Sequence, residues 1–335
     1  MVDIKKSVPL APYTTFGIGG SAKFFVEVNS IQDLTEAVTF AKDNNSPIFV
    51  LGGGSNILIS DGGFNGLVIK INVRGINYLN TQTGLCIRAG AGEMWDDVVA
   101  KTVELKAGGL ENLSLIPGTV GGAVYQNIGA YGAEIKDTIE SVLVFDISTS
   151  NIVRLSGDEC GFDYRFSIFK KNRNFIILEV ELLLSKEWKP NLSYPDLKVV
   201  FDSKTPTITE VREAVVGIRK RKIYYPKELG SAGSFFKNPS MKISNYRFLI
   251  SKHSDLKSRH VGNGLVKLSA AQLIEKAGWK GKRIGNVGVA DKHALVLVNY
   301  GGGKSKELDH LAADIIKSVR AKFDVTLEPE VEKVP

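Results

Sequence analysis

Short runs in which almost every residue is apolar alternate along this chain with longer segments in which apolar residues recur every three or four positions. Mostly apolar runs bounded by turn residues predict buried β-strands. Such runs occupy residues 22–28, 48–51, 67–71, 85–89, 175–184 and 294–298. Two further runs, 141–147 and 151–155, are separated by three polar residues and predict a β-hairpin.

The helical period predicts helices that begin near residues 31, 94, 207, 269 and 305. Ser30 with Asp33, and Thr207 with Glu210, have the spacing of N-terminal capping pairs. The last helix, 305–323, is long and has an apolar stripe along one face. Residues 186–206 are polar and contain three prolines, so we expect a loop or an inserted excursion there.

Glycine is concentrated in Gly108–Gly132, which reads GGLENLSLIPGTVGGAVYQNIGAYG and holds seven glycines. Each glycine gives up more backbone freedom on folding than any other residue, so such a stretch needs a reason. Close approach of the backbone to another group, or repeated positive φ, would be one. A tightly packed backbone crossing inside a large core is the structural alternative, and this stretch alone does not decide between them.

Two other glycine clusters follow predicted strands. Gly52-Gly53-Gly54-Ser55-Asn56 could form a nest of backbone N–H groups for a phosphate, although a simple turn is the alternative. It is not a P-loop, because no Gly-Lys-Ser/Thr follows. Gly90-Ala91-Gly92 precedes a predicted helix, but Trp95 stands where a dinucleotide-binding fingerprint needs its third glycine, so a Rossmann site is excluded.

Three polar positions in the second half of the chain are candidates for chemistry. Ser234 lies between Gly233 and two large aromatic residues, which argues for a fixed, partly buried serine rather than a surface turn. Glu330 follows Pro329, so its backbone is constrained, although a charged tail is the simpler interpretation. The basic run Arg219–Lys222 ends a helix and would ordinarily be a solvated face.

Composition narrows the class of protein. Hydrophobic residues make up 43% and charged residues 24% of 335 residues, which is ordinary for globular proteins and predicts two or three domains. No apolar run approaches the roughly 18 residues that would span a bilayer, and the N-terminus lacks a signal-peptide core, so we expect a cytoplasmic protein. Two distant cysteines and four scattered histidines predict no metal site and no disulfide. The net charge of +7 favours anionic ligands.

Six motifs in register resemble one family. YTTFGIGG, LGGGSNIL, the 108–132 stretch, YRFSIFK, GSAGSFFKNP and LEPEV occur in the order, and at about the spacing, of the UDP-N-acetylenolpyruvoylglucosamine reductases (MurB), and the resemblance extends from Tyr13 to Val331. The loop around Tyr194 is similar to that of the type I members. The resemblance implies an α+β fold: a vanillyl-alcohol-oxidase (PCMH) type FAD-binding fold in two subdomains, plus a C-terminal α/β substrate-binding domain.

The resemblance also implies boundaries and a cofactor site. The expected divisions are an FAD-binding subdomain at 1–72, a second with the Tyr194 loop at 73–206, a substrate-binding domain at 207–324, and a C-terminal segment at 325–335 that returns to the active site. FAD would be bound non-covalently. The residues implied to hold it are Gly52, Gly53, Gly54, Ser55, Asn56, Ile116, Pro117, Gly118, Gly121 and Gly122.

The implied catalytic residues are Arg165, Ser234 and Glu330, and the implied substrate-binding residues are Tyr194, Lys222 and Asn238. In the family's reaction NADPH reduces FAD, and the enolpyruvyl ether of the sugar nucleotide is then reduced to UDP-N-acetylmuramate during peptidoglycan precursor synthesis. Two positions depart from the family pattern. Pro195 follows Tyr194 where glycine is commoner, and Glu332 stands where type I members often have an arginine.

The chemistry of these residues suits the implied reaction. A guanidinium is always charged and can grip a carboxylate with two hydrogen bonds, so Arg165 would stabilise the charge that develops on the substrate. Ser234 would donate the proton to C2, and Glu330 would help to hold the enol. No second dinucleotide fingerprint is present, so we expect NADPH and the sugar nucleotide to use one site in turn.

Two other functions are open at the level of sequence. An FAD-dependent sugar or alcohol oxidase of the same fold would reoxidise rapidly in air without NADPH. A basic nucleic-acid-binding protein using 219–222 would be colourless and sensitive to salt. The family resemblance favours the reductase, acting on UDP-N-acetylglucosamine enolpyruvate as a monomer, with no nucleic-acid or membrane partner.

Overall fold

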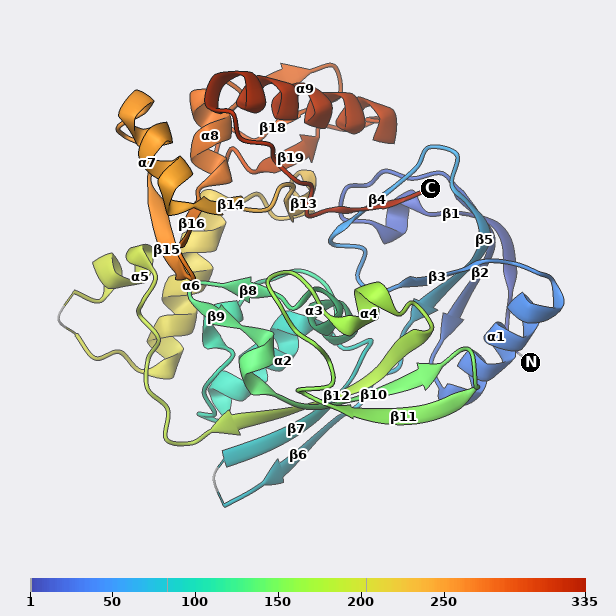
Figure 1. Cartoon of the computed structure of the whole chain (residues 1–335). Coiled ribbons are helices and arrows are strands. Elements are labelled where there is room, and N and C mark those ends of the chain that lie inside the picture. The colour runs from blue at the N-terminus through green and yellow to red at the C-terminus, as the bar shows by residue number, and fades with distance from the viewer. Residues whose placement is uncertain (1, 83, 203) are drawn as a thin grey trace. The chain divides into compact units, whose positions relative to one another are not determined.

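The computed structural model describes residues 2–82, 84–202 and 204–335. The chain divides into two compact units, whose elements are labelled in Figure 1. The first unit comprises Met1–Val8, Ala22–Gly54 and Asn65–Lys220, and the second comprises Pro9–Ser21, Ser55–Phe64 and Arg221–Pro335. Each unit therefore draws on segments that are distant in the sequence. The four divisions expected from the family stay a prediction.

One sheet of the first unit has the strand order β1-β2-β5-β3. Its strands are β1 (Lys5–Pro9), β2 (Ser21–Val28), β3 (Ile48–Leu51) and β5 (Phe64–Ile71), and β3 pairs with β5 in parallel. Helix α1 (Ile31–Asp43) begins at the predicted capping box, in which Ser30 accepts from the Asp33 N–H and the Asp33 side chain accepts from the Ser30 N–H. Its apolar side packs in the same core as β2 and β5.

The other sheet of this unit is antiparallel, with the order β11-β10-β12-β7-β6. Its strands are β6 (Ile76–Asn80), β7 (Gly84–Gly90), β10 (Ile139–Asp146), β11 (Asn151–Ser156) and β12 (Phe175–Ser185). The register from Ser141↔Ser156 to Asp146↔Asn151 confirms the predicted hairpin. Helices α2 (Trp95–Glu104), α3 (Val120–Gln126) and α4 (Ile168–Lys171) share the core of this sheet.

Trp95 shows why the glycine pattern before α2 is not a dinucleotide site. Its indole is 1% exposed and donates a hydrogen bond to the carbonyl of Leu113, 2.9 Å away. Gly90 and Gly92 lie against backbone: a Cβ at either position would come within 2.5–2.7 Å of backbone atoms of residues 72–73. These glycines therefore allow close packing of two chain segments.

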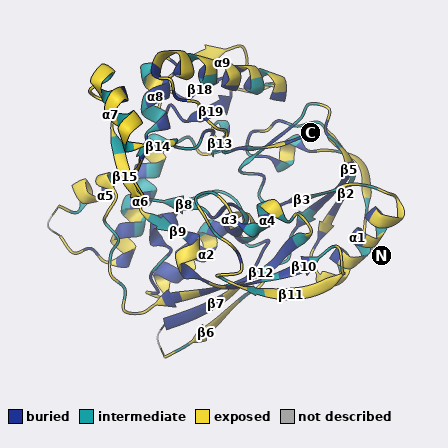
Figure 2. Ribbon diagram, viewed as in Figure 1, coloured by how far each residue is buried: buried dark blue, intermediate teal, exposed yellow. Residues whose placement is uncertain are grey.

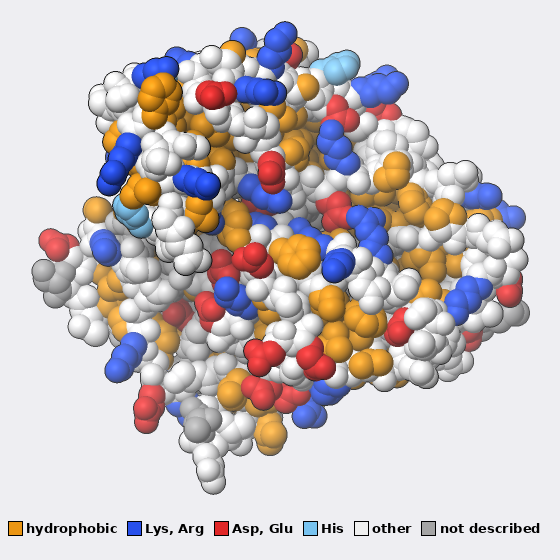
Figure 3. Space-filling model, viewed as in Figure 1, with side chains coloured by type: hydrophobic (Ala, Val, Ile, Leu, Met, Phe, Trp, Pro, Cys, Tyr) orange, Lys and Arg blue, Asp and Glu red, His pale blue; other side chains and the backbone are white. Residues whose placement is uncertain are grey.

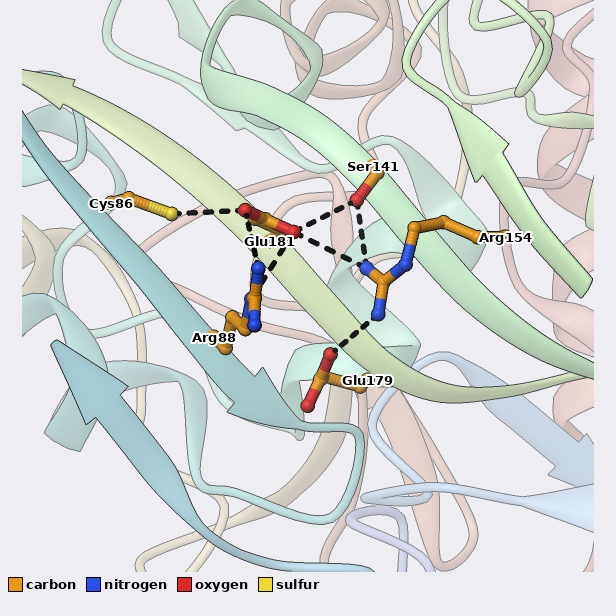
Figure 4. A network of polar contacts seen from close by, with 6 residues as sticks. All are labelled: Cys86, Arg88, Ser141, Arg154, Glu179 and Glu181. Carbon is orange, nitrogen blue, oxygen red and sulfur yellow. Dashed lines mark hydrogen bonds and ion pairs between the residues drawn. The ribbon is translucent and has the colours of Figure 1, made fainter. Parts of the chain in front are cut away.

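A polar network spans neighbouring strands of the antiparallel sheet (Figure 4). Glu181 on β12 accepts hydrogen bonds from the Cys86 thiol (3.1 Å) on one oxygen and from Ser141 (3.2 Å) on the other, and it pairs with Arg88 and Arg154. Burial disfavours the charged form of Glu181, but the hydrogen bonds and the Arg88 charge outweigh it, so the pKa of this carboxyl is lowered. Cross-strand pairs of this kind help to fix the register of a sheet.

The segment expected to be a loop at 186–206 is partly helical. Helix α5 (Pro195–Val200) begins after Tyr194, with Pro195 at its first position, where proline is favoured. Leu197 of α5 is fully buried with Val211, Val215 and Ile218 of helix α6 (Ile208–Lys222). The predicted capping pair of α6 is present, because Glu210 accepts from the Thr207 N–H and Thr207 accepts from the Glu210 N–H.

The second unit contains two small sheets, of order β13-β19-β18-β17 and β14-β16-β15, and a parallel pair, β20-β4. The strands are β4 (Ile57–Ile59), β13 (Gly230–Ser234), β14 (Ser240–Lys242), β15 (Ser258–Gly262), β16 (Leu265–Leu268), β17 (Arg283–Ile284), β18 (Val287–Val289), β19 (Val296–Asn299) and β20 (Glu332–Val334). Its helices are α7 (Ile243–Lys252), α8 (Ala270–Lys276) and α9 (Ser305–Phe323).

The apolar side of α9 is buried in the core of the second unit, as the sequence predicted, and Figure 2 shows its exposed outer side.

Short 3-10 turns and one small hairpin complete the fold: Ala11–Tyr13, Glu111–Leu113, Ile135–Thr138, β8 (Gly129–Ala130) and β9 (Ala133–Glu134).

None of the helices in the described residues is long and apolar enough to cross a bilayer. The same residues contain no group of three or more His, Cys, Asp or Glu side chains arranged to hold a metal ion. On the face drawn in Figure 3, Lys and Arg side chains are interspersed with Asp and Glu, so the excess positive charge is not collected in one patch of that face.

Candidate active site

Ser234 lies at the end of β13, next to a bulge. The β13–β19 pairing runs through Gly230↔Asn299 and Ser231↔Val298, shifts register, and resumes at Ser234↔Val296. Gly233 in the bulge has φ +70°, a conformation that favours glycine, and a Cβ there would meet no atom within 4 Å. The bulge therefore leaves open space at Gly233, the residue before Ser234.

The C-terminal segment lies along the residues that follow Ser234. The Glu330 N–H donates to the carbonyl of Phe235 (2.8 Å), and the Lys237 N–H donates to the carbonyl of Glu328 (2.9 Å). Phe236 also forms a bridge with Pro329. Phe235 and Phe236 are 0% and 1% exposed, which confirms their predicted burial. The backbone thus brings Glu330 next to Phe235, the neighbour of Ser234, although the two residues are 95 positions apart in the sequence.

Asn56, the last residue of the GGGSN motif, contacts the same segment. Its side-chain amide donates to the Glu330 carbonyl (3.2 Å), and its own carbonyl accepts from the Glu332 N–H (3.0 Å). The parallel pairing of β4 with β20 continues from this point. Glu332, the residue that departs from the family pattern, is thus held by its backbone at the start of β20.

Lys222 and Asn238 belong to the same unit as Ser234. The oxygen of the Asn238 amide accepts from the Ala270 N–H (2.9 Å), so its NH₂ group is the part that can serve a ligand. Burial and then the positive charge of Lys222 lower the pKa of His293. Ile223, directly after Lys222, packs against the buried cluster of Ala290, Val296 and Val298, and Val296 is the strand partner of Ser234.

Arg165 belongs to the first unit and has a left-handed backbone, φ +54°. The turn around it is closed by reciprocal backbone hydrogen bonds between Asp163 and Phe166. Its Nη2 donates to the Gly129 carbonyl (2.7 Å), and a Cβ at Gly129 would lie 3.0 Å from Nη1. A non-glycine residue held at positive φ is strained, and such strain is often found at functional sites.

Three glycine-containing segments of the first unit meet. A Cβ on Gly53 would lie 2.5 Å from Cα of Gly118, and one on Gly52 would lie 3.0 Å from Oγ1 of Thr119. Two backbone hydrogen bonds also join residues 118–121 to residues 91–95. The Trp95 N–H donates to the Gly118 carbonyl (3.0 Å), and the Gly121 N–H donates to the Ala91 carbonyl (2.9 Å). We call residues 52–53, 91–95 and 118–122 the glycine junction. It confirms that close backbone approach is one reason for these glycines.

The turn that leads into Ile116 and Pro117 is held on both sides. Leu115 has φ +59°; its N–H donates to Asp96, and its carbonyl accepts from Nε of Arg219 (3.2 Å). Arg212 holds Asp96 with two hydrogen bonds, of 2.8 and 3.1 Å. Arg219 is thus engaged with the glycine-rich stretch, and the expectation that the 219–222 run is only a solvated face is wrong for this residue.

Tyr194 is 38% exposed, and its ring meets that of Tyr131 edge-on, with 5.1 Å between centroids. Tyr131 is itself at φ +48°, and burial raises the pKa of its hydroxyl. Tyr194 therefore rests on the far end of the same glycine-rich stretch that forms the glycine junction.

The site residues predicted from sequence thus fall into two groups. Ser55, Asn56, Lys222, Ser234, Asn238 and Glu330 lie in the second unit, and Gly52–Gly54, Ile116–Gly122, Arg165 and Tyr194 lie in the first.

Comparison with known proteins identifies the family. A model of the UDP-N-acetylenolpyruvoylglucosamine reductase C-terminal domain matches residues 225–334, and an FAD-binding domain model matches 22–156. The reductases of Ralstonia nicotianae and Neisseria gonorrhoeae are each 40% identical, over 96% and 100% of this chain and 96% and 99% of their own lengths. The chain belongs to the UDP-N-acetylenolpyruvoylglucosamine reductase family.

A solved structure of this family, MurB from Thermus caldophilus, is also similar over the whole chain. It has a TM-score of 0.69 and 26% identity, and the match covers 100% of this chain and 99% of that one. The predicted family, the α+β fold with an FAD-binding domain, and the class of FAD-containing oxidoreductase are thereby confirmed.

The residues of the glycine junction fit the FAD that this reductase family uses. Thr119 is 4% exposed, and among the described residues its Oγ1 is one of the few buried side-chain oxygens without a hydrogen-bond partner. It occupies the N-cap of α3 but makes no capping hydrogen bond. A buried, unused hydroxyl beside bare glycine backbone suits a polar ligand such as a diphosphate.

Sequence reasoning did not select Thr119 for the cofactor, nor Asp96 and Arg212 for support. The one available signal for Thr119 was its place between Gly118 and the Gly121-Gly122 pair, in a position where a threonine ordinarily caps a helix. The Asp96–Arg212 pair joins residues 116 positions apart, which no local pattern could reveal.

Proposed function

We propose that this reductase transfers hydride from NADPH, by way of non-covalently bound FAD, to the enolpyruvyl ether of UDP-N-acetylglucosamine enolpyruvate, and so forms UDP-N-acetylmuramate for peptidoglycan. Membership of the family supports the reaction. The observation in the structure that supports the site most directly is the pairing of 328–330 with 235–237, which brings Glu330 alongside the segment of Ser234.

FAD, when bound, supplies the hydride that reduces the double bond of the substrate. Gly52–Asn56 and Ile116–Gly122 would hold it, with Thr119 as a further hydrogen-bond donor. The clamp of Asp96 and Arg219 on Leu115 fixes the turn on which Ile116 and Pro117 are placed. No cysteine or histidine lies in these segments, so non-covalent binding is expected.

Arg165 is assigned to the substrate carboxylate. As hydride is added at C3, negative charge develops at C2 and spreads into the carboxylate, so a guanidinium there stabilises the transition state more than the ground state. The hydrogen bond to Gly129 and the strained turn hold this arginine in a defined position before substrate binds. That preorganisation is what makes such a charge effective in catalysis.

Ser234 is assigned as the proton donor to C2, and Glu330 as the group that holds the developing enol. A hydroxyl is a weak acid, but the enolate is strongly basic, so the transfer is favourable. Ser234 is only partly buried, so a substrate can reach it. The hydrogen bonds of the Glu330 backbone to Phe235 and Asn56 fix where its side chain begins.

Lys222 and Asn238 are assigned to the substrate diphosphate, and Tyr194 closes over the substrate. Lys222 contributes charge, and the Asn238 amide contributes N–H donors because its oxygen is already engaged by Ala270. We further propose that NADPH and the sugar nucleotide use the same site in turn, that the protein acts as a monomer in the cytoplasm, and that the family divisions at residues 72, 206 and 324 mark functional parts.

The test is anaerobic reduction of the purified yellow protein by NADPH, followed by a pulse of UDP-N-acetylglucosamine enolpyruvate. We expect the flavin absorbance to bleach with NADPH and to return with the sugar nucleotide. Parallel double-reciprocal lines would support use of one site in turn. Bleaching without recovery, or rapid reoxidation by air alone, would contradict the proposal and favour an oxidase.

A further inference from the structure

The loop that carries Tyr194 has a well-defined root, formed by contacts within the first unit. We call residues 186–194 the Tyr194 loop. At its start Ser185 and Gly108 exchange two backbone hydrogen bonds, of 2.9 and 3.2 Å. Three residues later the indole N–H of Trp188 donates to Oε1 of Glu111, 2.9 Å away. These contacts attach the loop to the first residues of the glycine-rich stretch.

Glu111 is a buried carboxylate whose two oxygens are both used. It is 3% exposed, and its Oε2 accepts from the Gly109 N–H (2.8 Å) while Oε1 accepts from Trp188. A buried charge is costly unless it is hydrogen-bonded, so its retention calls for an explanation. Here one oxygen fixes the glycine-rich stretch and the other fixes the loop, and the carboxylate joins the two.

Gly108 explains why the indole can approach so closely. A Cβ at this position would overlap Cδ1 of Trp188, so the ring lies on bare backbone. Gly109 beside it has φ +132°, which also favours glycine. Gly108, which lies outside the glycine junction, is therefore accounted for by the loop.

The remainder of the loop is held by residues from both ends of the same stretch. Asn112, 1% exposed, donates to the carbonyls of both Asn191 (2.9 Å) and Tyr131 (2.8 Å). Asn191 in turn donates to the Gly132 carbonyl (3.0 Å). The ring of Tyr194 then rests on Tyr131. The loop between Trp188 and Tyr194 is thus held at its root by Glu111 and, further along, by the contacts of Asn191 with Asn112 and Gly132.

We propose that Glu111 is a positioning residue for this reductase: acting through Trp188, it fixes the root of the Tyr194 loop and so sets where Tyr194 meets the sugar nucleotide. The inference rests on the proposed role of Tyr194 as a substrate-binding residue. We call the hydrogen bond between Trp188 and Glu111 the anchor. The inference predicts that the anchor affects binding of the sugar nucleotide and not the reduction of FAD by NADPH.

The test uses two variants of the contact, Trp188→Phe, which removes the N–H donor and leaves a smaller aromatic ring, and Glu111→Gln. The control is Glu187→Gln, a matched change at an exposed carboxylate of the same loop. We expect the first two to raise KM for UDP-N-acetylglucosamine enolpyruvate about tenfold, the scale of one hydrogen bond to a charged group. The rate of anaerobic FAD reduction by NADPH and the FAD content should stay within about twofold. Glu187→Gln should change none of these.

Combining Trp188→Phe with Tyr194→Ala shows whether the anchor acts through Tyr194. We expect no further rise in KM over Tyr194→Ala alone, because the side chain that the anchor positions is already absent. Additive effects would overturn the inference, and so would an unchanged KM in an active enzyme. A parallel loss of FAD would instead indicate a structural role in the glycine junction and would also overturn it.

Hydrogen exchange provides a readout that does not depend on the substrate. In Trp188→Phe we expect backbone amides of residues 189–194 to exchange at least tenfold faster than in the unmodified protein, with residues 118–122 unchanged. Unchanged exchange at 189–194 would overturn the anchor. If the unmodified protein fails to turn over the enolpyruvyl sugar nucleotide while this exchange result holds, the proposed substrate is wrong and the anchor itself stands.

Discussion

At the scale of single residues, Thr119 combines burial with a hydroxyl that has no hydrogen-bond partner among the described residues. Removing this hydroxyl should therefore weaken FAD binding without destabilising the FAD-free protein. Thr119→Val removes a buried oxygen without a partner, so the FAD-free protein should be no less stable than the parent. The same change should weaken FAD binding about tenfold to hundredfold, the usual range for a hydrogen bond to a charged group. Flavin fluorescence titration and thermal melting of the FAD-free protein measure the two effects.

Two comparisons make the Thr119 result specific. Thr119→Ser keeps the hydroxyl and should bind FAD nearly as well as the parent. Thr102→Val changes another buried threonine, whose hydroxyl donates to the Val99 carbonyl (2.8 Å), and should cost stability without changing the affinity for FAD. If Thr119→Val and the parent bind FAD with equal affinity, Thr119 does not bind the cofactor.

Ser234 makes a prediction that separates the two half-reactions. Ser234→Ala should leave reduction of FAD by NADPH within about twofold and should slow turnover of the sugar nucleotide by roughly 10²–10⁴-fold, the usual range for a general acid. Ser234→Cys should retain much of the activity, because a thiol also donates a proton. Stopped-flow absorbance of each half-reaction is the measurement. Slowing of both half-reactions to the same extent would show that Ser234 is not the donor.

At the scale of elements, the network on the antiparallel sheet should control the reactivity of Cys86. Burial, and then the hydrogen bond to Glu181, raise the pKa of this thiol from 9.0 to about 11. Only the thiolate reacts with iodoacetamide, so at pH 8 the reactive fraction is roughly a hundredfold smaller than for an ordinary cysteine. We expect the native protein to resist alkylation at pH 8 and to lose that resistance as pH rises toward 11.

Substitutions within the network provide the controls for Cys86. Glu181→Gln removes the negative charge beside the Cys86 thiol and should speed its alkylation. Glu179 pairs with Arg154 instead, so Glu179→Gln should leave the alkylation rate of Cys86 unchanged. Cys160 is an internal reference because Glu181 does not contribute to its pKa. Burial, and then the nearby charge of Glu159, raise the pKa of the Cys160 thiol to about 12. Mass spectrometry of each cysteine distinguishes these cases. Equal acceleration at both cysteines would indicate general loosening of the sheet.

Elements defined by local signals were predicted well. Helix α9 has the bounds 305–323 that its apolar period predicts, and α1 begins at the predicted Ser30–Asp33 capping box. Helix α5 was missed because its short, proline-led sequence becomes helical only where Leu197 packs against α6. Tertiary contacts of this kind override local propensity and cannot be read from a periodic pattern.

At the scale of the whole molecule, only the residues of the candidate site that lie in sequence motifs could be proposed from the sequence. The family resemblance located Ser234 and Glu330, and the structure adds that residues 235–237 and 328–330 pair directly. The supports of the site are different: Asp96 with Arg212, and Glu111 with Trp188, join residues 77 to 116 positions apart through single side chains. Such pairs leave no periodic signal, so they required the fold.

Removal of FAD should therefore loosen the molecule locally rather than uniformly. A ligand that binds only the folded state adds about 2.7 kcal/mol of stability at a hundred times its Kd. We expect that stabilisation to be concentrated in the glycine junction, where bare backbone and the Thr119 hydroxyl would contact FAD. Hydrogen exchange should quicken at residues 52–54 and 116–122 after the flavin is removed, and should return on its readdition. The sheet β14-β16-β15 carries none of the residues assigned to FAD and is the control region. Faster exchange spread evenly over both regions would mean that FAD stabilises the protein without occupying the glycine junction.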